Sequence, residues 1–312
     1  MTARVVLVTG ASSGIGEATA RLAAQRGEHL VLLARGRDAL GRVAADCDEL
    51  GAASTTVTVA DVADDDAVRR AVADAMARHG RLDVVVGAAG VVAYGRIEDV
   101  PVDVFDGVLA TNLTGSANLV RHVLPVLREQ EEGSIVLVGS VIGHMAVPDM
   151  AAYVLSKWGL RGLVRQLRVD NRDRPRLRFG YVAPGGVDTP IYEQAATYGD
   201  AVGRPPFPVQ APERVAARVL ATVDRPWRGG QTSAANHVIR LGFSALPWAY
   251  DRMVGPLFTV AAQDLVREVV RGPGNVLASR QEHNALHGTH GNALAAVARN
   301  LVEVGRRRRK AA

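Results

Sequence analysis

A glycine-rich turn between a buried strand and a helix constrains the fold of this chain more than any other feature. Residues 4–9 form a continuous β-branched and apolar run, which is typical of a strand buried on both faces of a parallel sheet. Three glycines follow at once, and an alanine-rich stretch at 17–26 then predicts a helix closed by Gly27. A second apolar run at 29–34 completes a strand–helix–strand unit.

The glycines of this turn are Gly10, Gly14 and Gly16, spaced Gly-x-x-x-Gly-x-Gly. Glycines here let the backbone approach a pyrophosphate, while the N-terminus of the next helix offers free N–H groups and a positive dipole end. The pattern therefore predicts a dinucleotide site. The alternative is a tight turn in an α/β protein that binds no nucleotide.

The end of the second strand indicates which dinucleotide binds. Folds that take NAD place a carboxylate there for the ribose 2′-hydroxyl, but this chain has Ala34, then Arg35 and Arg37. An arginine can bind a 2′-phosphate through charge-assisted contacts. NADP is therefore favoured over NAD, although the negative charge of Asp38 weakens the positive field of the arginines. The alternative is that both arginines are solvated in a loop and bind no phosphate.

A tyrosine and a lysine four residues apart suggest acid–base chemistry. Tyr153 and Lys157 lie at positions i and i+4, so on a helix they share one face. A free phenol has a pKa of about 10, and a nearby ammonium lowers it toward the working pH of a general acid/base. Ser140 lies thirteen positions upstream at the end of an apolar run.

Taken in order, these motifs resemble the short-chain dehydrogenase/reductase family over residues 5–191. The stretch at 9–16 is similar to the cofactor motif of that family, and the stretch at 184–189 resembles the loop that covers the nicotinamide. The resemblance implies the fold, a doubly wound α/β Rossmann-type parallel sheet with helices on both faces. It also implies these cofactor-binding residues: Gly10, Ser12, Ser13, Gly14, Ile15, Gly16, Arg35, Asp61, Val62, Ala89, Gly90, Tyr153, Lys157, Pro184, Gly185, Val187 and Thr189.

The resemblance assigns a catalytic role to four residues. Tyr153 would exchange a proton with the substrate oxygen, and Ser140 would hold that oxygen. Lys157 would lower the pKa of Tyr153 and bind the nicotinamide ribose. Asn112 would keep a water that connects Lys157 to solvent.

The chain departs from the family pattern after the fourth strand, expected at residues 82–86. Gly87-Ala88-Ala89-Gly90 stands where the family usually has Asn-Asn-Ala-Gly. In the family, the first Asn mainly connects neighbouring strands. Its absence here is therefore expected to affect the rigidity of this turn and the affinity for the cofactor more than the chemical step. Ser13 occupies the position before Gly14 that is basic in some NADP-preferring members, so the NADP preference rests on Arg35 and Arg37.

Composition limits the class of protein. The single Cys47 excludes an intramolecular disulfide and a cysteine-based zinc site. The first strand follows the N-terminus directly and no apolar run reaches about 18 residues, so a cytoplasmic protein without a spanning helix is expected. We expect residues 1–235 to form the dinucleotide-binding and catalytic domain. Residues 236–312 would be a helical extension rather than an independent domain.

The C-terminal third carries no family motif, and in this family it shapes the substrate pocket. The stretch at 192–208 predicts a lid, the stretch at 212–223 a helix, and the stretch at 230–232 the last strand. Residues 238–270 form an extension past the minimal domain, and within it 241–262 is strongly apolar. Helices packed on the domain or on a partner subunit are the favoured interpretation, over a flap that contacts a membrane surface or shelters an apolar substrate.

Two polar features of this region resemble binding sites. His283, His287 and His290 would share one face of a helix, but Gly288 argues against a helix, so no metal is expected. The basic tail at 306–310 accounts for much of the net charge of +5, and a frayed, solvated end is favoured over contact with nucleic acid or anionic lipid.

These observations predict an NADP-dependent oxidoreductase that interconverts a carbonyl compound and an alcohol. A small, moderately apolar substrate and a homo-oligomer are expected, with no nucleic acid partner. One alternative is a reductase of acyl-thioester ketones, for which Arg204 would be a carrier-binding residue at the cleft mouth. The other is a non-catalytic NADP-sensing protein on the same fold.

Overall fold

A seven-stranded parallel sheet forms the centre of the molecule. The computed structural model describes residues 3–311, with side chains through residue 306. The strand order is β10-β7-β6-β4-β1-β2-β3, and all neighbours in it are parallel. The strands of the sheet are β1 (Val5–Thr9), β2 (His29–Ala34), β3 (Ser54–Val59), β4 (Val84–Gly87), β6 (Gly133–Val138), β7 (Leu177–Ala183) and β10 (Gly230–Gln231).

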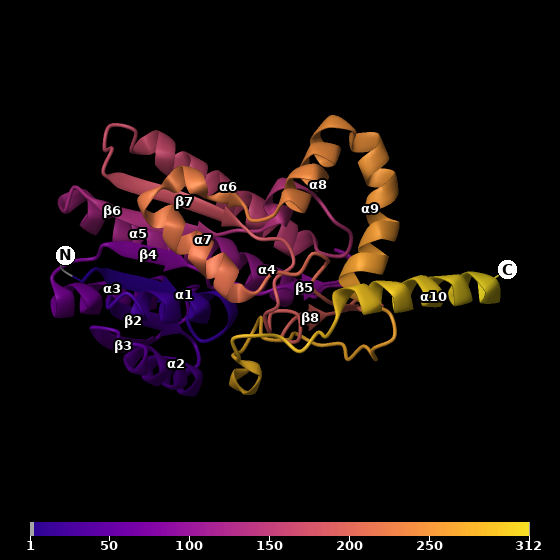
Figure 1. The fold of residues 1–312 in the computed structure, drawn as a ribbon, viewed down its shortest axis with the longest axis horizontal. Coiled ribbons are helices and arrows are strands. Elements are labelled where there is room, and N and C mark those ends of the chain that lie inside the picture. Colours follow the sequence, from indigo (N-terminus) through magenta and orange to yellow (C-terminus); the bar gives the residue numbers. More distant parts are fainter. Residues whose placement is uncertain (1–2, 312) are drawn as a thin grey trace.

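Helices cover both faces of this sheet (Figure 1). Helix α1 packs against α2 and α7 on one face, and α3 packs against α5 on the other. The helices of the domain are α1 (Gly14–Ala24), α2 (Arg37–Glu49), α3 (Asp65–His79), α4 (Val102–Leu109), α5 (Gly115–Glu129), α6 (Ala151–Asp170) and α7 (Pro212–Asp224), with short helical turns η1 (Ala110–Thr114), η2 (Val141–His144) and η3 (Pro226–Arg228).

Strands β1, β2, β4 and β6 are mostly apolar because both of their faces are buried, whereas the edge strand β3 is rich in threonine and only partly buried. Val5 and Leu7 of β1 belong to the core under α3, α5 and α6, whereas Val6 and Val8 belong to the core under α1, α2 and α7. Successive side chains of a strand point to opposite faces of the sheet, so a single strand contributes residues to both cores. The predicted doubly wound α/β fold is confirmed.

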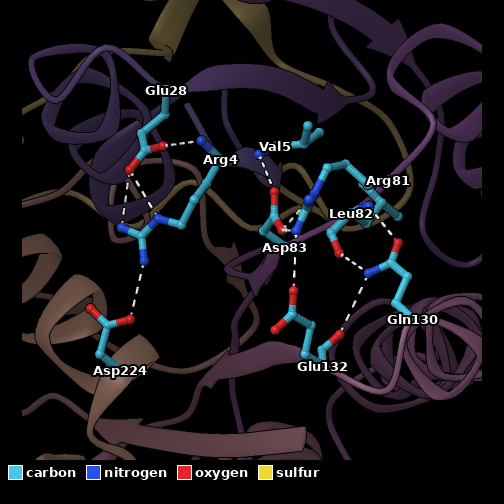
Figure 2. Close-up of polar contacts among 9 residues, drawn as sticks. All are labelled: Arg4, Val5, Glu28, Arg81, Leu82, Asp83, Gln130, Glu132 and Asp224. Atoms are coloured by element: carbon cyan, nitrogen blue, oxygen red, sulfur yellow. Dashed lines mark hydrogen bonds and ion pairs between the residues drawn. The ribbon is translucent and has the colours of Figure 1, made fainter. Parts of the chain in front are cut away.

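A network of polar contacts holds the amino ends of β1 and β4 (Figure 2). The Asp83 carboxylate accepts a hydrogen bond from the Val5 backbone N–H at 2.8 Å and pairs with Arg81. On the other side, the Glu28 carboxylate accepts hydrogen bonds from the Arg4 backbone N–H at 2.6 Å and from its Nε at 3.0 Å. These contacts attach the amino end of β1 to the segments before β4 and β2.

The predicted element boundaries agree with the structure to within a few residues. Helix α1 starts at Gly14 rather than at residue 17, because the last two glycines of the turn already belong to its first turn. The fourth strand is Val84–Gly87 rather than 82–86. The stretch at 192–208 contains two short strands, β8 (Ala196–Thr197), paired with β5 (Ala93–Tyr94), and β9 (Val202–Gly203).

The C-terminal extension projects from the carboxyl-end side of the sheet (Figure 1). Its elements are α8 (Ala234–Ala245), α9 (Pro247–Ala262), β11 (Gln263–Asp264), the turn η4 (Gln281–His283) and α10 (Ala293–Ala311). Strand β11 pairs antiparallel with β9, so the extension is joined to the domain by backbone hydrogen bonds. None of the helices within residues 3–311 combines the length and the apolar composition that crossing a membrane requires.

The expectation of a frayed tail was wrong for the backbone, because α10 continues through the basic stretch at 306–310. The side chain of Asn300, which is buried in this helix, donates hydrogen bonds to the carbonyls of Val260 at 2.9 Å and Gln263 at 2.7 Å. The first half of α10 is thereby attached to the end of α9, and the residues that follow have a high helix propensity.

Candidate active site

The predicted site residues gather at the carboxyl ends of the strands, where the strand order reverses between β1 and β4. Ligands of open α/β sheets bind at such a reversal. Gly10 and Gly14 have φ of +66° and +51°, a region that favours glycine. A Cβ at Gly10 would lie 2.7 Å from the Ala89 Cα, and one at Gly16 would lie 2.1 Å from the Gly10 carbonyl oxygen. The turn therefore requires glycine at these positions.

A long cleft begins at this turn and encloses about 890 Å³, counting the open solvent at its mouth. It brings together most of the predicted cofactor residues, which lie far apart in the sequence. Those that line it are Gly10, Ser12, Ser13, Gly14, Ile15, Gly16, Arg35, Asp61, Val62, Ala89, Gly90 and Thr189.

The remaining predicted cofactor residues lie beside this cleft rather than on its wall. Gly185 lines an adjoining cavity, and the Pro184 carbonyl accepts a hydrogen bond from the Val141 N–H at 2.7 Å. Val187 is buried in the core under α1 and α7. Arg37 is exposed and does not line the cleft, so its support for NADP binding stays a prediction.

The turn after β4 is hydrogen-bonded to β1 in the absence of the amide side chains that the family usually has there. The Thr9 hydroxyl accepts hydrogen bonds from the backbone N–H groups of Ala88 at 3.2 Å and Ala89 at 3.3 Å. A Cβ at Gly87 would lie 2.6 Å from a methyl of Leu137. This chain therefore uses the hydroxyl of β1 to hold the turn and fills the space of the missing side chain with leucine.

Asn112 lies in the π-helical turn η1 between α4 and α5, and it is completely buried. Its side-chain oxygen accepts from the Val91 N–H at 2.8 Å, and its nitrogen donates to the Val91 carbonyl at 2.9 Å and the Ser156 hydroxyl at 3.0 Å. Single π turns occur frequently at functional sites. In this structure the amide connects the segment after β4 to α6, one turn from Tyr153.

Tyr153, Lys157 and Ser140 meet as predicted, from α6 and the end of β6. Ser140 and Tyr153 line the same cavity, and the Lys157 Nζ lies 5.5 Å from the centroid of the Tyr153 ring. The Lys157 Nζ also donates to the Val138 carbonyl at 3.2 Å. The two side chains share one helix face because they are one turn apart.

The pKa of Tyr153 differs from the expectation drawn from its spacing to Lys157. Burial raises the pKa of Tyr153 well above 10, and a hydrogen bond with Ser140 opposes this only partly. Burial also lowers the pKa of Lys157 from 10.5 to about 8. The expected lowering by Lys157 was wrong for this arrangement, since desolvation of the phenolate outweighs an amine that is turned toward Val138.

Arg35 reaches the cleft, but its guanidinium is bound by the C-terminal extension. It donates to the carbonyls of Asn275 at 2.5 Å and Val276 at 3.2 Å, and it lies 3.8 Å from Asp61. The segment that holds it also lines the cleft through four residues that the sequence did not indicate: Asn275, Ser279, Arg280 and Asn284.

The same segment is attached to the glycine turn and to α2. The Ala285 carbonyl accepts from the Gly14 N–H at 3.0 Å, and the Gln281 side chain accepts from the Asp38 N–H at 2.9 Å. These contacts were missed because residues 272–292 have no periodicity, and backbone carbonyls leave no signal in a sequence.

A second cavity opens beside Tyr153 and is mostly apolar. Phe258 and Ala262 of α9 complete its wall, so the extension contributes directly to it. The other residues on this wall are Val92, Tyr94, Ser140, Val141, Ile142, Met150, Tyr153, Gly185, Ile191, Tyr192, Arg204 and Pro206.

Two histidines of the extension contact carboxylates of the domain. His287 pairs with Glu213 at 2.8 Å and with Asp188 at 3.4 Å, and His290 pairs with Glu193 at 3.1 Å. Residues 3–306 contain no group of three or more histidine, cysteine, aspartate or glutamate side chains that could hold a metal ion.

The fold and these clefts define an α/β protein with a dinucleotide-type turn and a tyrosine–lysine–serine group. The sequence pattern of the short chain dehydrogenase family matches residues 4–198. The chain belongs to this family, whose members are oxidoreductases.

Comparison with individual proteins agrees with this assignment. The chain is 37% identical over 199 residues to Oxidoreductase UcpA of Salmonella typhimurium, covering 63% of this chain and 74% of the relative. A short chain dehydrogenase from Mycobacterium paratuberculosis bound to NAD superimposes with a TM-score of 0.64 at 27% identity, covering 73% and 94% of the two chains. An alcohol dehydrogenase from the archaeon Thermococcus sibiricus, complexed with 5-hydroxy-NADP, gives 0.63 at 29% identity, covering 74% and 95%.

Proposed function

We propose that this protein transfers hydride between NADP and a carbonyl or alcohol substrate, with Tyr153 as the acid/base. The observation that carries this proposal is the meeting of Ser140 and Tyr153 in a cavity beside the glycine-turn cleft, with the Lys157 Nζ 5.5 Å from the Tyr153 ring. The two solved relatives bind NAD and 5-hydroxy-NADP respectively, which supports a nicotinamide dinucleotide for this chain as well.

The residues of the cleft fit a dinucleotide. The tight glycine turn and the N-terminus of α1 suit a pyrophosphate, and Asp61 and Val62 line the region predicted for the adenine. A pyrophosphate at this terminus would compete with the Ala285 carbonyl for the Gly14 N–H. When bound, the nicotinamide supplies or receives the hydride.

The side chains would handle the proton. The Tyr153 hydroxyl would donate its proton to the carbonyl oxygen, and the Ser140 hydroxyl would donate a hydrogen bond to the same oxygen. The phenolate that remains is costly in a buried site, so the charge of Lys157 would stabilise it. With a pKa of about 8, the Lys157 amine is mainly protonated at neutral pH and can return a proton to the phenolate.

Tyr153→Phe tests this function. An enzyme of this type loses roughly 100-fold or more of its turnover when its general acid is removed, while calorimetry still detects NADPH binding. Tyr192→Phe is the matched control, because Tyr192 lines the same cavity without a proposed proton-transfer role. If Tyr153→Phe kept its turnover, the proposed acid/base role would be wrong. If neither variant nor wild type reduced any carbonyl compound while NADPH bound, a sensing protein would be supported.

The preference for NADP rests on the cations of the cleft. Arg35 and Arg280 line it, and Ala34 replaces the carboxylate that binds a ribose 2′-hydroxyl. Dissociation constants for NADPH and NADH, measured side by side, should favour NADPH. Arg35→Ala should weaken NADPH binding more than NADH binding, and an equal loss for both would contradict a role at the 2′-phosphate.

We also propose that the working form is a homo-oligomer. Apolar side chains are exposed on α8 and α9, among them Leu241, Trp248 and Leu257. Association through such helix faces removes apolar surface from water. Light scattering on the purified protein tests this, and a monomer at micromolar concentration would contradict it.

A further inference from the structure

A third cavity lies where β9, β11 and the start of α10 meet, and it is lined by three arginines. Arg204, Arg267 and Arg299 come from three segments far apart in the sequence. The cavity encloses about 830 Å³, including the open solvent at its mouth. Its other charged or titratable lining groups are Asp264 and His290.

Arg204 is the unusual member of this group, because it is almost completely buried. Only 4% of its surface is exposed, and both terminal nitrogens of its guanidinium are inaccessible and have no hydrogen-bond partner within the described part of the chain. Burial lowers the pKa of Arg204, but an arginine keeps its charge in proteins. A buried charge without a partner is strongly unfavourable, so the fold retains this group at a cost in stability.

The opposing charges nearby are already engaged. The Asp264 carboxylate accepts hydrogen bonds from the backbone N–H groups of Val266 at 3.1 Å and Arg267 at 3.2 Å, and burial lowers the pKa of Arg204 more than the charge of this carboxylate raises it. His290 pairs with Glu193. The cavity is thus lined by three guanidinium groups and one carboxylate, that of Asp264, which is hydrogen-bonded to backbone N–H groups. The net charge of the cavity lining is positive.

Backbone pairing holds Arg204 in place between two cavities. Its N–H donates to the Ala262 carbonyl at 2.9 Å, next to the antiparallel pair of β9 and β11. Arg204 lines the three-arginine cavity and also the apolar cavity that contains Ser140 and Tyr153. The two cavities therefore adjoin at this residue, which lies inside the molecule and not at an exposed cleft mouth as the sequence suggested.

We propose that the three-arginine cavity binds an anionic group of the substrate, a carboxylate or a phosphate, while the carbonyl end of the same molecule reaches Tyr153. The inference rests on the proposed function, because it places the reacting carbonyl in the Tyr153 cavity. The planar fork of Arg204 suits either oxyanion, and the side chain would turn toward the cavity to bind one, because its terminal nitrogens are inaccessible in this structure. The apolar wall that includes Val92 and Phe258 suits the carbon chain between the two ends.

Matched probes with and without the anion test the proposal and separate its two forms. For a carboxylate, the probes are 4-oxopentanoate, 5-oxohexanoate and 6-oxoheptanoate against their methyl esters. For a phosphate, they are acetoacetyl-4′-phosphopantetheine against acetoacetyl-pantetheine, which differ only in the phosphate. The readouts are KM for NADPH-dependent reduction and, independently of turnover, calorimetric binding in the presence of NADP⁺.

In the wild type, the anionic member of at least one pair should bind tenfold or more tightly than its neutral partner. Arg204→Met should reduce that ratio to below twofold, and Arg204→Lys should keep part of it, since a lysine retains charge without the fork. Arg69→Met, on α3 and outside both cavities, removes the same charge and should leave the ratio unchanged.

Thermal unfolding provides a second readout that a structural arginine would not share. Because the terminal nitrogens of Arg204 have no hydrogen-bond partner among the described residues, Arg204→Met should unfold at the same or a higher temperature than the wild type. A lower Tm, a failure to fold, equal binding within every pair, or a ratio that survives Arg204→Met would each overturn the inference. Reduction of neutral probes without any preference would leave the proposed function standing and remove only this inference.

Discussion

Replacing Lys157 by methionine should make the protein more stable at neutral pH while abolishing turnover. Lys157 is buried, and burial lowers its pKa from 10.5 to about 8. Since each pKa unit is worth about 1.4 kcal/mol, keeping the ammonium charged in the folded state costs roughly 3 kcal/mol. The hydrogen bond from its Nζ to the Val138 carbonyl offsets about 1 kcal/mol. The expected gain at pH 7 is therefore about 2 kcal/mol.

The sign of the pH dependence follows from proton binding. Between about pH 8 and pH 10.5 the folded state has released the proton of Lys157 and the unfolded state still holds it. Stability therefore rises with pH across this window and is flat with respect to this group below it. At pH 9.5 the wild type should have regained roughly 2 kcal/mol, so the difference from Lys157→Met should be close to zero.

Urea unfolding of both proteins without nucleotide, at pH 7 and at pH 9.5, measures this difference. Leu160→Met is the control, because it is a volume-conserving change at a buried position one turn along α6 and carries no titratable group. Its effect should be the same at both pH values. A Lys157→Met protein that is less stable than the wild type at pH 7, or a difference that does not change with pH, would refute the reasoning.

Four further changes test other contacts. Thr9→Val should cost about 1–3 kcal/mol and weaken NADPH binding, because two N–H groups of the turn after β4 lose their acceptor; calorimetry and urea unfolding measure both. Asp83→Ala should cost a similar amount, about 1–3 kcal/mol in urea unfolding, without changing the cofactor dissociation constant. Gln281→Ala should cost about 1 kcal/mol, as for a lost helix cap, and speed proteolysis of residues 272–292. Burial raises the pKa of Glu17 to about 7, so wild-type stability should fall as pH rises from 4.5 to 7, and Glu17→Gln should remove this fall of roughly 3 kcal/mol.

The fold could be predicted because its determinants are local. A strand buried on both faces reads as an uninterrupted apolar run, and β2 was expected at 29–34 and is found at His29–Ala34. A turn that needs φ near +60° selects glycine, so Gly10 and Gly14 are visible in the sequence. Boundaries were less certain, because the last residues of a strand or helix depend on partners from other elements.

The contacts of the C-terminal extension could not be predicted. Arg35 is bound by the carbonyls of Asn275 and Val276, which every residue type possesses. Arg204 is buried only because β9 pairs with β11, about 60 residues away, and a single arginine in a proline-rich stretch carries no sign of this. Such long-range pairings depend on the whole fold.

The sequence by itself determined the strand–turn–helix unit, the shared helix face of Tyr153 and Lys157 and the family of the protein, since each depends on spacing over a few residues. The tertiary structure alone decided the environment of these groups. Burial, not spacing, sets the pKa of Tyr153, and the return of the extension across the domain sets the walls of the clefts. Desolvation depends on everything packed around a group, so it is settled only when the distant parts of the chain come together.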